Sequence, residues 1–276
     1  MNYVSQAPQP FRNLDDSGEA ESAAIRLEAR SRMPASLEMF DAFIKPLLTP
    51  SPARVLEVGA GTAPLARRVA KLLPDSRVYA TDKSDGMVAY ARRMAEEDGV
   101  SMDAAKWDVT SPASMPFTDG QFDLILSSVM MPYLTDGEAL AAARTMVQHL
   151  SPGGHLVFIE QQGSSQTVFG FPQALMMPAR EPSPAPLKQT LHLGLRGLLR
   201  STGLELLPTQ SFVWTETTYD FYVRDLLDRY LQFRLQEGVL TADEVADWRT
   251  ALQELADAGD FYYGLVYHRI VGQKPA

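Results

Sequence analysis

The chain has 276 residues, of which 45% are hydrophobic and 21% charged, a composition typical of a soluble globular protein. The formal net charge is −9, which disfavours nucleic acid as a partner, because proteins bind it largely by neutralising phosphates with lysine and arginine. Cysteine is absent, which excludes disulfides, thiolate metal sites and cysteine nucleophiles and is consistent with a cytoplasmic protein. No run reaches the roughly 18 apolar residues of a membrane span, and the four histidines show no metal-ligand spacing.

The first residues are polar and rich in proline, glutamine and aspartate, so we expect a flexible arm over 1–19 and a single domain over 20–276. Apolar residues recur at helical spacing over 20–48. From residue 54 onward, short apolar runs alternate with amphipathic stretches, which predicts right-handed βαβ units and a mostly parallel sheet covered by helices on both faces. The expected strands are 54–61, 76–82, 104–109, 121–129 and 154–160, and the helices between them are 63–73, 84–99 and 135–150.

Capping residues predict where several helices begin and end. Ser84 is the expected N-cap of the helix over 84–99, and Gly99 is its C′ residue. Thr135 and Glu138 form a capping box for the next helix, and the TADE segment predicts a second one near residue 241.

The pattern changes after the fifth strand. Five prolines fall within 164–190, which is too many for one regular element, so we expect an irregular cap insertion there. A helix over 187–203 and a strand over 204–214, bent at Pro208, follow it. Two amphipathic helices form a second cap insertion at about 219–259, and a last strand covers 260–272. We expect the arm and both insertions to form a mobile lid.

The most informative segment is VLEVGAG, a glycine turn directly between a buried strand and a helix. Gly59 and Gly61 allow a tight turn and a close approach of the backbone to a ligand. The helix that follows presents unpaired N–H groups and the positive end of its dipole to that ligand. Pro64 occupies the third glycine position of the dinucleotide fingerprint, which argues against a nicotinamide or flavin cofactor.

Acidic residues follow the next two strands. Asp82 ends the second strand, where a carboxylate can accept both hydroxyls of a ribose. Asp108 comes directly after Trp107 at the end of the third strand, where it can accept from an adenine amino group while an apolar neighbour packs on the ring. These strand ends meet at the carboxyl edge of the sheet, where doubly wound folds bind their ligands.

The ordered set of EVGAGT, the Asp82 strand end, WDV, PFTDGQFDLILSS and LSPGGHLVFIE resembles the class I S-adenosylmethionine-dependent methyltransferases, in their small-molecule branch called type 11. The resemblance covers about residues 20–162 and extends to the last strand. It implies a doubly wound, mostly parallel, seven-stranded Rossmann-like sheet with helical cap insertions, and S-adenosyl-L-methionine as the cofactor. Ala63 departs from the pattern by replacing a common glycine.

The resemblance also implies roles for individual residues. It assigns the loop that holds the amino-acid end of the cofactor to Glu57, Gly59, Ala60 and Gly61. Asp82 corresponds to the acid that binds the ribose, and Lys83 lies near the edge of the adenine. Asp108 corresponds to the acid that binds the adenine, with Trp107 and Val109 beside it. The backbone of Ser127 faces the methionine amino group, and Arg30, with Arg26 as the alternative, reaches the cofactor carboxylate from an upstream helix.

Candidate catalytic groups are fewer. Tyr133 lies just past the fourth strand and is expected to line the acceptor site. His192 is the best histidine candidate for a base, and Pro132 stands where many relatives carry a histidine. Methionine and aromatic residues in the segments around the site predict an acceptor pocket suited to an apolar molecule of irregular shape.

The sequence thus predicts methyl transfer to the oxygen, carbon or nitrogen of a small, largely apolar metabolite, natural-product or quinone-like, without a metal. The expected partner is this small-molecule acceptor, not nucleic acid, and the oligomeric state is left open, with a homodimer as one arrangement. The alternative is a protein of the same fold that binds S-adenosylmethionine and catalyses a cyclisation or rearrangement without methyl transfer.

Overall fold

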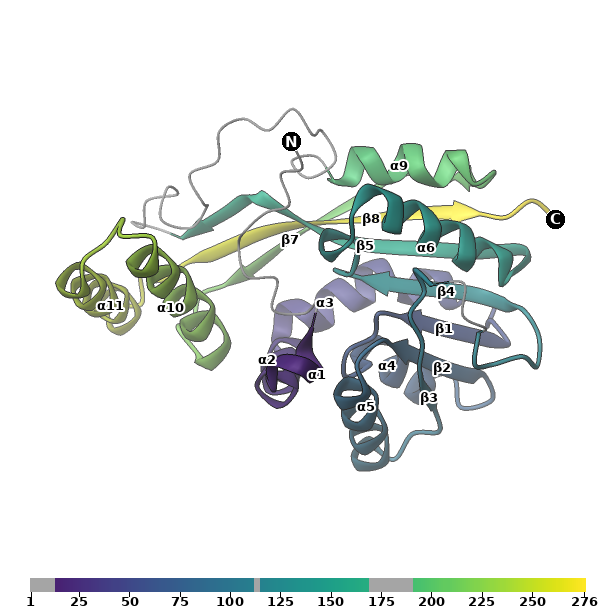
Figure 1. Cartoon of the computed structure of the whole chain (residues 1–276), viewed down its shortest axis with the longest axis horizontal. Helices are drawn as coiled ribbons and strands as arrows, with labels where there is room; N and C mark the ends of the chain where they lie inside the picture. Colours follow the sequence, from purple (N-terminus) through teal and green to yellow (C-terminus); the bar gives the residue numbers. More distant parts are fainter. Residues whose placement is uncertain (1–12, 112–114, 169–190) are drawn as a thin grey trace.

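The computed structural model describes residues 13–111, 115–168 and 191–276. Within these residues an eight-stranded sheet forms the centre of the molecule (Figure 1), in the order β3-β2-β1-β4-β5-β8-β6, with β7 also paired to β8. The strands are β1 (Arg54–Val58), β2 (Arg77–Asp82), β3 (Asp103–Lys106), β4 (Phe122–Ser128), β5 (Leu150–Val168), β6 (Glu205–Leu206), β7 (Gln210–Glu216) and β8 (Tyr263–Gln273).

Strands β1 to β5 pair in parallel, whereas β6, β7 and β8 are antiparallel to their neighbours. The chain runs outward from β1 to β3 and then returns to β4 on the other side of β1. The strand order therefore reverses between β1 and β4, which is the point where doubly wound sheets open a crevice at their carboxyl edge.

The prediction of seven strands was wrong by one. The strand expected over 204–214 is divided into β6 and β7, which both pair with β8. Pro208 has no N–H to donate to a ladder, so the chain bends there, while the N–H of Leu207 still donates to the carbonyl of Val271 at 3.0 Å.

Helices cover both faces of the sheet because alternate residues of the central strands point to opposite sides. On one face, Val55 and Leu124 pack with α3 (Pro34–Phe43), α4 (Pro64–Leu72) and α5 (Asp85–Asp98). On the other, Leu56 and Ile125 pack with α6 (Asp136–Gln148) and α9 (Leu191–Ser201). Two short 3₁₀ turns, η1 (Lys45–Leu48) and η2 (Met131–Tyr133), connect elements along these faces.

The predicted caps are confirmed. The Ser84 hydroxyl accepts from the N–H of Met87, and Gly99 ends α5 in the left-handed region with φ of 65°. Capping boxes begin α6 at Thr135 and α11 at Thr241.

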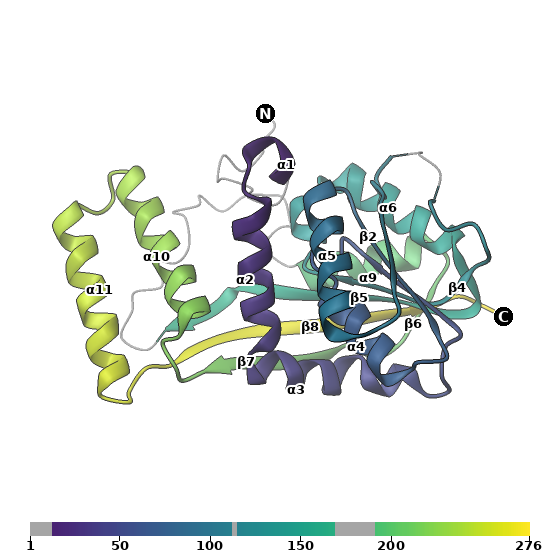
Figure 2. The same ribbon diagram turned by 90° about the horizontal axis from the view of Figure 1, so that it is seen from below.

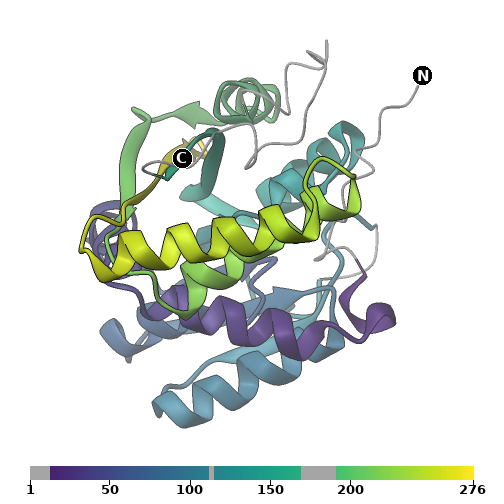
Figure 3. The ribbon, with the colours of Figure 1, turned by 90° about the vertical axis from the view of Figure 1, so that its left-hand side faces the viewer.

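The end of the molecule that carries α10 (Phe221–Gln236) and α11 (Ala242–Asp257), away from β1 to β4, is built on the long strands β5 and β8 (Figure 2). After its pairing with β4 ends at Ile159, β5 continues to Val168 against β8. Strand β7 joins them, and α10 and α11 lie between β7 and β8 in the chain. Seen from that end, α11 is the outer helix of the pair (Figure 3). These two helices occupy the predicted second insertion.

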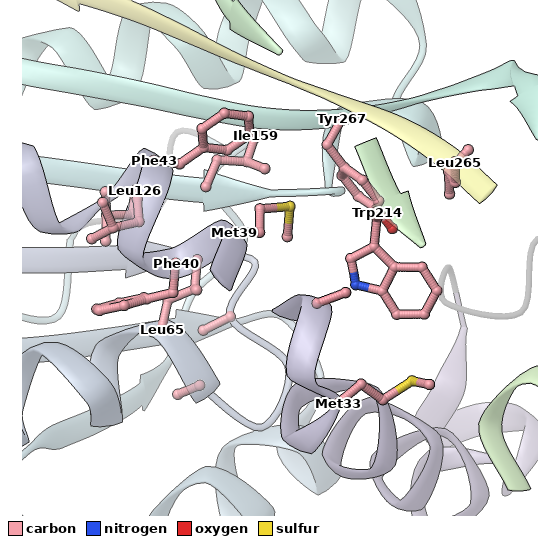
Figure 4. Packing of buried hydrophobic residues seen from close by; sticks show 14 of the residues in the cluster. Met33, Met39, Phe40, Phe43, Leu65, Leu126, Ile159, Trp214, Leu265 and Tyr267 are labelled. Carbon is pink, nitrogen blue, oxygen red and sulfur yellow. The ribbon is translucent and has the colours of Figure 1, made fainter. Parts of the chain in front are cut away.

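Trp214 of β7 anchors this end to the rest of the core (Figure 4). Its side chain is 1% exposed and its Nε1 donates to the Ser36 hydroxyl at 3.3 Å. Tyr222 and Tyr263 pack edge-on against its ring, with centroids 6.0 and 5.6 Å away. The contacts join α3, β7, α10 and β8 into one packed wall.

The end of the predicted arm is tied to the domain. Residues 1–12 lie outside the described part of the chain, but α1 (Leu14–Ser17) and α2 (Ala20–Arg32) follow directly. The Asp15 carboxylate accepts from the Ser84 hydroxyl at 2.6 Å and from the N–H of Asp85 at 2.8 Å, at the start of α5.

The first predicted insertion is only partly described. Its first residues, 164–168, belong to β5 rather than to an irregular segment, because β8 offers them a pairing partner. Residues 169–190 lie outside the described residues. None of the helices that the structure describes is both long and apolar enough to span a membrane.

Candidate active site

The glycine turn between β1 and α4 brings the backbone close to neighbouring side chains. Gly59 has φ of 64° and Gly61 has φ of 55°, a region that residues with a Cβ rarely adopt. A Cβ on Gly59 would lie 2.5 Å from the Sδ of Met130, and one on Gly61 would lie 2.7 Å from the Cδ1 of Leu27. Both glycines are therefore favoured by backbone conformation. At Gly59 the Met130 side chain also fills the space of a Cβ, whereas at Gly61 only the end of the flexible Leu27 side chain would have to move.

Glu57 lies beneath this loop. Its side chain is buried, and its Oε2 accepts from the N–H of Ala66, in the first turn of α4, at 2.8 Å. Burial raises the pKa of Glu57 to about 7. The carboxyl group thus lies at the positive end of the helix dipole and on the cavity wall.

Asp82 connects the glycine loop to the end of β2. Its Oδ2 accepts from the N–H of Gly61 at 2.8 Å, and its Oδ1 accepts from the N–H of Ser84 at 3.0 Å. Burial raises the pKa of this carboxyl. The backbone N–H of Lys83 also donates to this carboxyl. A carboxylate offers about four acceptor positions, so Asp82 keeps some capacity to accept from a ligand.

The residues after β3 form an apolar wall with an acid at its rim. Trp107 and Val109 are buried, and the Trp107 ring packs edge-on against His149 with centroids 5.8 Å apart. Asp108 is exposed and its Oδ1 accepts from the N–H and hydroxyl of Thr110 at 3.0 and 2.6 Å.

One cavity of about 450 Å³ joins these groups, a volume within the usual range for small-molecule sites. Most of the residues that the sequence predicted for the site line its wall: Arg30, Glu57, Gly59, Ala60, Gly61, Asp82, Lys83, Trp107, Asp108, Val109 and Tyr133. The parallel strands bring them together, because their carboxyl ends meet at one edge of the sheet.

Two predicted residues are not among the described residues of the wall. Ser127 is 1% exposed, and the wall at the end of β4 is formed by Ser128 and Val129 instead, since successive side chains of a strand point to opposite faces. His192 lies within α9, but its side chain is outside the described part of the structure.

The opposite end of the cavity is rich in tyrosine. Tyr222 and Tyr230 of α10 line it, together with Tyr133 and with Tyr263 of β8. Gln166 of β5 links two of them, since its Oε1 accepts from the Tyr230 hydroxyl at 3.0 Å and its Nε2 donates to the Tyr263 hydroxyl at 2.9 Å. The amide and both hydroxyls are thereby held in fixed orientations.

Arg30 lies between the two ends. Its Nη2 donates to the Tyr267 hydroxyl at 2.9 Å, and its Cζ is 5.3 Å from the centroid of the same ring. Burial raises the pKa of Tyr133 to about 12, although the nearby Arg30 charge lowers it. The Tyr133 phenol is therefore neutral at physiological pH.

Glu160 lies behind the wall at the end of the paired part of β5. It is 1% exposed, its Oε1 accepts from the N–H of Met131 at 3.2 Å, and burial raises its pKa to about 8. It supports the turn η2, which carries Met131 and Tyr133. In the part of the chain that the structure describes, no three histidine, aspartate or glutamate residues are grouped as metal ligands.

Sequence reasoning missed several residues of the cavity wall, one in α4 and the others at the tyrosine-rich end. Arg68, Gln166, Arg229 and Tyr230 line the cavity, and none of them belongs to a recognisable motif. A signal did exist in α10, where Tyr222, Leu226, Arg229 and Tyr230 recur at helical spacing and share one face.

Comparisons with known proteins agree with this geometry. A family model described as a methyltransferase domain matches residues 55–154. The chain is 35% identical over 123 residues to malonyl-[acyl-carrier protein] O-methyltransferase of Hahella chejuensis, a match covering 45% of this chain and 41% of that protein. Demethylmenaquinone methyltransferase of Thermus thermophilus is 31% identical over 123 residues, covering 45% and 54%. The chain thus spans about half, or less, of the length of these curated relatives.

Among solved structures, the N-methyltransferase NodS of Bradyrhizobium japonicum, in complex with S-adenosyl-L-homocysteine, has a TM-score of 0.51 and 14% identity, with 94% of this chain and 100% of that chain covered. At this identity the likeness concerns the fold alone. The matched family model and the strand order agree, and residues 55–154 are therefore similar to a methyltransferase domain with a doubly wound fold.

Proposed function

We propose that the chain binds S-adenosylmethionine in this cavity and transfers the methyl group to a small-molecule acceptor. The observation that carries the proposal is that a single cavity joins the glycine loop and the strand-end carboxylates to the tyrosine-rich end. A cofactor at the first end would place its reactive group beside an acceptor at the second.

The residues at the glycine loop fit this cofactor. Gly59 and Gly61 line the cavity, and a Cβ on either would meet the Met130 or Leu27 side chain of the same wall. Asp82 lines the cavity at the end of β2 and keeps some acceptor capacity beyond its backbone hydrogen bonds, which suits the hydroxyls of a ribose. Asp108 can accept from the adenine amino group through Oδ2, which has no hydrogen bond among the described residues.

The remaining cofactor contacts are proposed on the resemblance and on their place in the cavity wall. Trp107 and Val109 would pack on the adenine ring, with Lys83 at its edge. Glu57 would accept from the methionine amino group, near the backbone of Ser127. Arg30 would donate to the methionine carboxylate.

The bound cofactor supplies a methyl group on a sulfonium, whose leaving group is already activated. The chain therefore needs mainly to align the acceptor and exclude water. Tyr133, as a neutral phenol, would orient the acceptor by donating a hydrogen bond rather than by removing a proton. His192 remains the predicted base for an acceptor that keeps its proton.

The acceptor class follows from the wall that faces it. The side chains of Met130, Tyr222, Leu226 and Tyr230 offer apolar and aromatic contact, which suits a natural-product or quinone-like molecule. We propose that α10 and α11, inserted between β7 and β8, act as a cap over this acceptor within a single domain.

Calorimetry with S-adenosylmethionine, S-adenosylhomocysteine and NAD tests the cofactor assignment. We expect both methionine-derived ligands to bind and NAD not to bind; binding of NAD alone at millimolar ligand would refute it. Incubation of a metabolite panel with methyl-labelled cofactor, followed by mass spectrometry, tests the transfer. Labelled product should form in step with S-adenosylhomocysteine, whereas product formed with the cofactor unchanged would establish the cyclisation or rearrangement alternative.

A further inference from the structure

The acidic side chains of the cavity wall lie towards one end, where Lys83 and Arg68 also line it. The acidic lining residues, Glu57, Asp82, Asp108 and Glu138, come from the glycine-loop side and from α6. At the other end, α2 contributes Arg26 and α10 contributes Arg229, with Arg30 between the two ends, and no acidic residue lines this end among the described residues. This end is cationic although the chain as a whole has a net charge of −9.

Arg26 of α2 is held in an unfavourable environment. It is half-buried, its Nε is inaccessible to solvent, and that nitrogen has no hydrogen-bond partner among the described residues. Burial lowers the pKa of Arg26, and the charge of Arg229 lowers it further. A buried donor on a charged group costs free energy unless it is paired, so an anionic ligand would relieve the cost.

Arg229 of α10 faces the same space. Its Nε lies 3.1 Å from an oxygen of Asp225, one turn earlier on the same helix. Asp225 and the exposed Glu19 act on Arg26 through space, and neither lines the cavity. Among the described residues, the carboxylate of Asp225 is therefore the one that lies close to this pair of arginines, and its Oδ2 is buried without a hydrogen bond. Glu19 acts on Arg26 only from the exposed surface.

The side chains around the two arginines suit the body of an organic anion. Tyr222, Leu226 and Tyr230 lie on the same face of α10 as Arg229, and aromatic and aliphatic carbon would surround the part of the ligand next to its charged group. Guanidinium groups bind carboxylates and phosphates with paired hydrogen bonds, so the site favours these two anions over a neutral polar group.

We propose that the cavity end between α2 and α10 binds a carboxylate or phosphate group of the methyl acceptor through Arg26 and Arg229. The proposal rests on the proposed function, because it takes this end of the cavity as the acceptor site. It narrows the acceptor from a largely apolar molecule to one that joins an apolar body to an anionic group.

The test is calorimetry on the full chain saturated with S-adenosylhomocysteine. The probes are benzoate, phenylacetate, hexanoate and phenyl phosphate, each compared with its neutral amide or alcohol. We expect at least one anion to bind about tenfold or more tightly than its neutral counterpart, since hydrogen bonds to charged groups are worth that much. The ranking of carboxylates against the phosphate identifies the anion, and equal affinity for every anion and its neutral counterpart would refute the proposal.

Substitutions of the two arginines test whether the anion binds between them. Arg26→Gln and Arg229→Gln should each weaken the best anion by about tenfold or more, and Arg26→Lys, which keeps the charge but not the paired geometry, should fall between. Arg32→Gln and Arg224→Gln are matched controls, because these arginines are exposed on the same two helices, and they should leave the affinity unchanged.

Binding of S-adenosylhomocysteine shows whether the two arginines hold the carboxylate of the cofactor or the anionic group of the acceptor. We expect its affinity to be the same in Arg26→Gln, in Arg229→Gln and in the unmodified chain. A comparable loss in both variants would mean that these arginines hold the cofactor carboxylate, and the proposal would fall while the proposed function stood. If the unmodified chain bound no S-adenosylhomocysteine, the proposed function would fail, and the anion probes without that ligand would still report on the arginine pair.

Discussion

Substitution of Gly59 by alanine tests how closely the glycine loop approaches its neighbours. Gly59 and Gly99 have nearly the same φ, 64° and 65°, but a Cβ on Gly59 would lie 2.5 Å from the Sδ of Met130, whereas a Cβ on Gly99 would meet nothing within 4 Å. Gly99→Ala therefore reproduces the backbone strain of Gly59→Ala without its steric contact, and the difference between the variants isolates that contact.

The expected losses of stability follow from the backbone strain and from the steric contact. A residue with a Cβ in the left-handed region costs about 1–2 kcal/mol, so Gly99→Ala should lower the free energy of unfolding by that amount. Displacing the packed Met130 side chain adds about 1–3 kcal/mol in Gly59→Ala. Because Met130 lines the cavity, its displacement should also weaken S-adenosylhomocysteine by about tenfold or more, equivalent to at least ~1.4 kcal/mol.

Urea unfolding gives the stabilities, and calorimetry with S-adenosylhomocysteine gives the affinities. In a double-mutant cycle, Met130→Ala should restore part of both losses in Gly59→Ala, because it removes the atoms that the new Cβ meets. If Gly59→Ala were no more destabilised than Gly99→Ala and bound the ligand equally well, the close approach of the loop to Met130 would be refuted.

The glycine-loop end of the site could be predicted from the sequence because each part of it is local. Gly59 and Gly61 follow a β-branched strand directly, and Asp82 ends the next strand, so strand order alone places them at one edge. The capping residues were equally predictable, since a hydroxyl and a carboxylate three residues apart satisfy the first N–H groups of a helix without any distant partner.

The tyrosine-rich end could not be predicted in the same way, because contacts between distant segments create it. Gln166, Arg229 and Tyr263 come from three elements, and none of them is adjacent in sequence to another. The polar stretch that contains Gln166 reads as irregular, yet it continues β5 because the last strand pairs with it across a register shift. The length of β5 therefore depends on its pairing partner and could not be predicted from the residues of β5 alone.

The remaining predictions concern charged groups. Asp82→Asn should weaken the binding of S-adenosylhomocysteine about tenfold or more, because an amide nitrogen cannot accept a hydrogen bond and hydrogen bonds to a charged group are worth about 1.5–3 kcal/mol. Calorimetry should show unchanged binding for the exposed control Asp85→Asn. If Asp82→Asn bound the ligand as tightly as the unmodified chain, the assignment of Asp82 would be contradicted. Arg67→Met should lower the free energy of unfolding in urea by about 3–5 kcal/mol, because Glu28, which now accepts from Arg67 at 2.5 Å, would stay buried with only the exposed Arg32, at 3.6 Å, as a charged partner. The double variant with Glu28→Leu should recover most of this loss, and a double variant as unstable as the single one would exclude the pairing as its cause. The last prediction concerns Glu160, whose pKa burial raises from 4.5 to about 8. Between these values the unfolded chain has released the proton that the folded chain still binds, so the free energy of unfolding should fall as pH rises, by up to about 1.4 kcal/mol per pH unit from this group. Glu160→Gln cannot ionise, and its unfolding free energy, measured in urea from about pH 5 to pH 8, should lack this part of the slope. A slope equal to that of the unmodified chain would mean that the folded protein holds Glu160 ionised throughout, and that the turn carrying Tyr133 rests on a charged carboxylate rather than on a neutral acid.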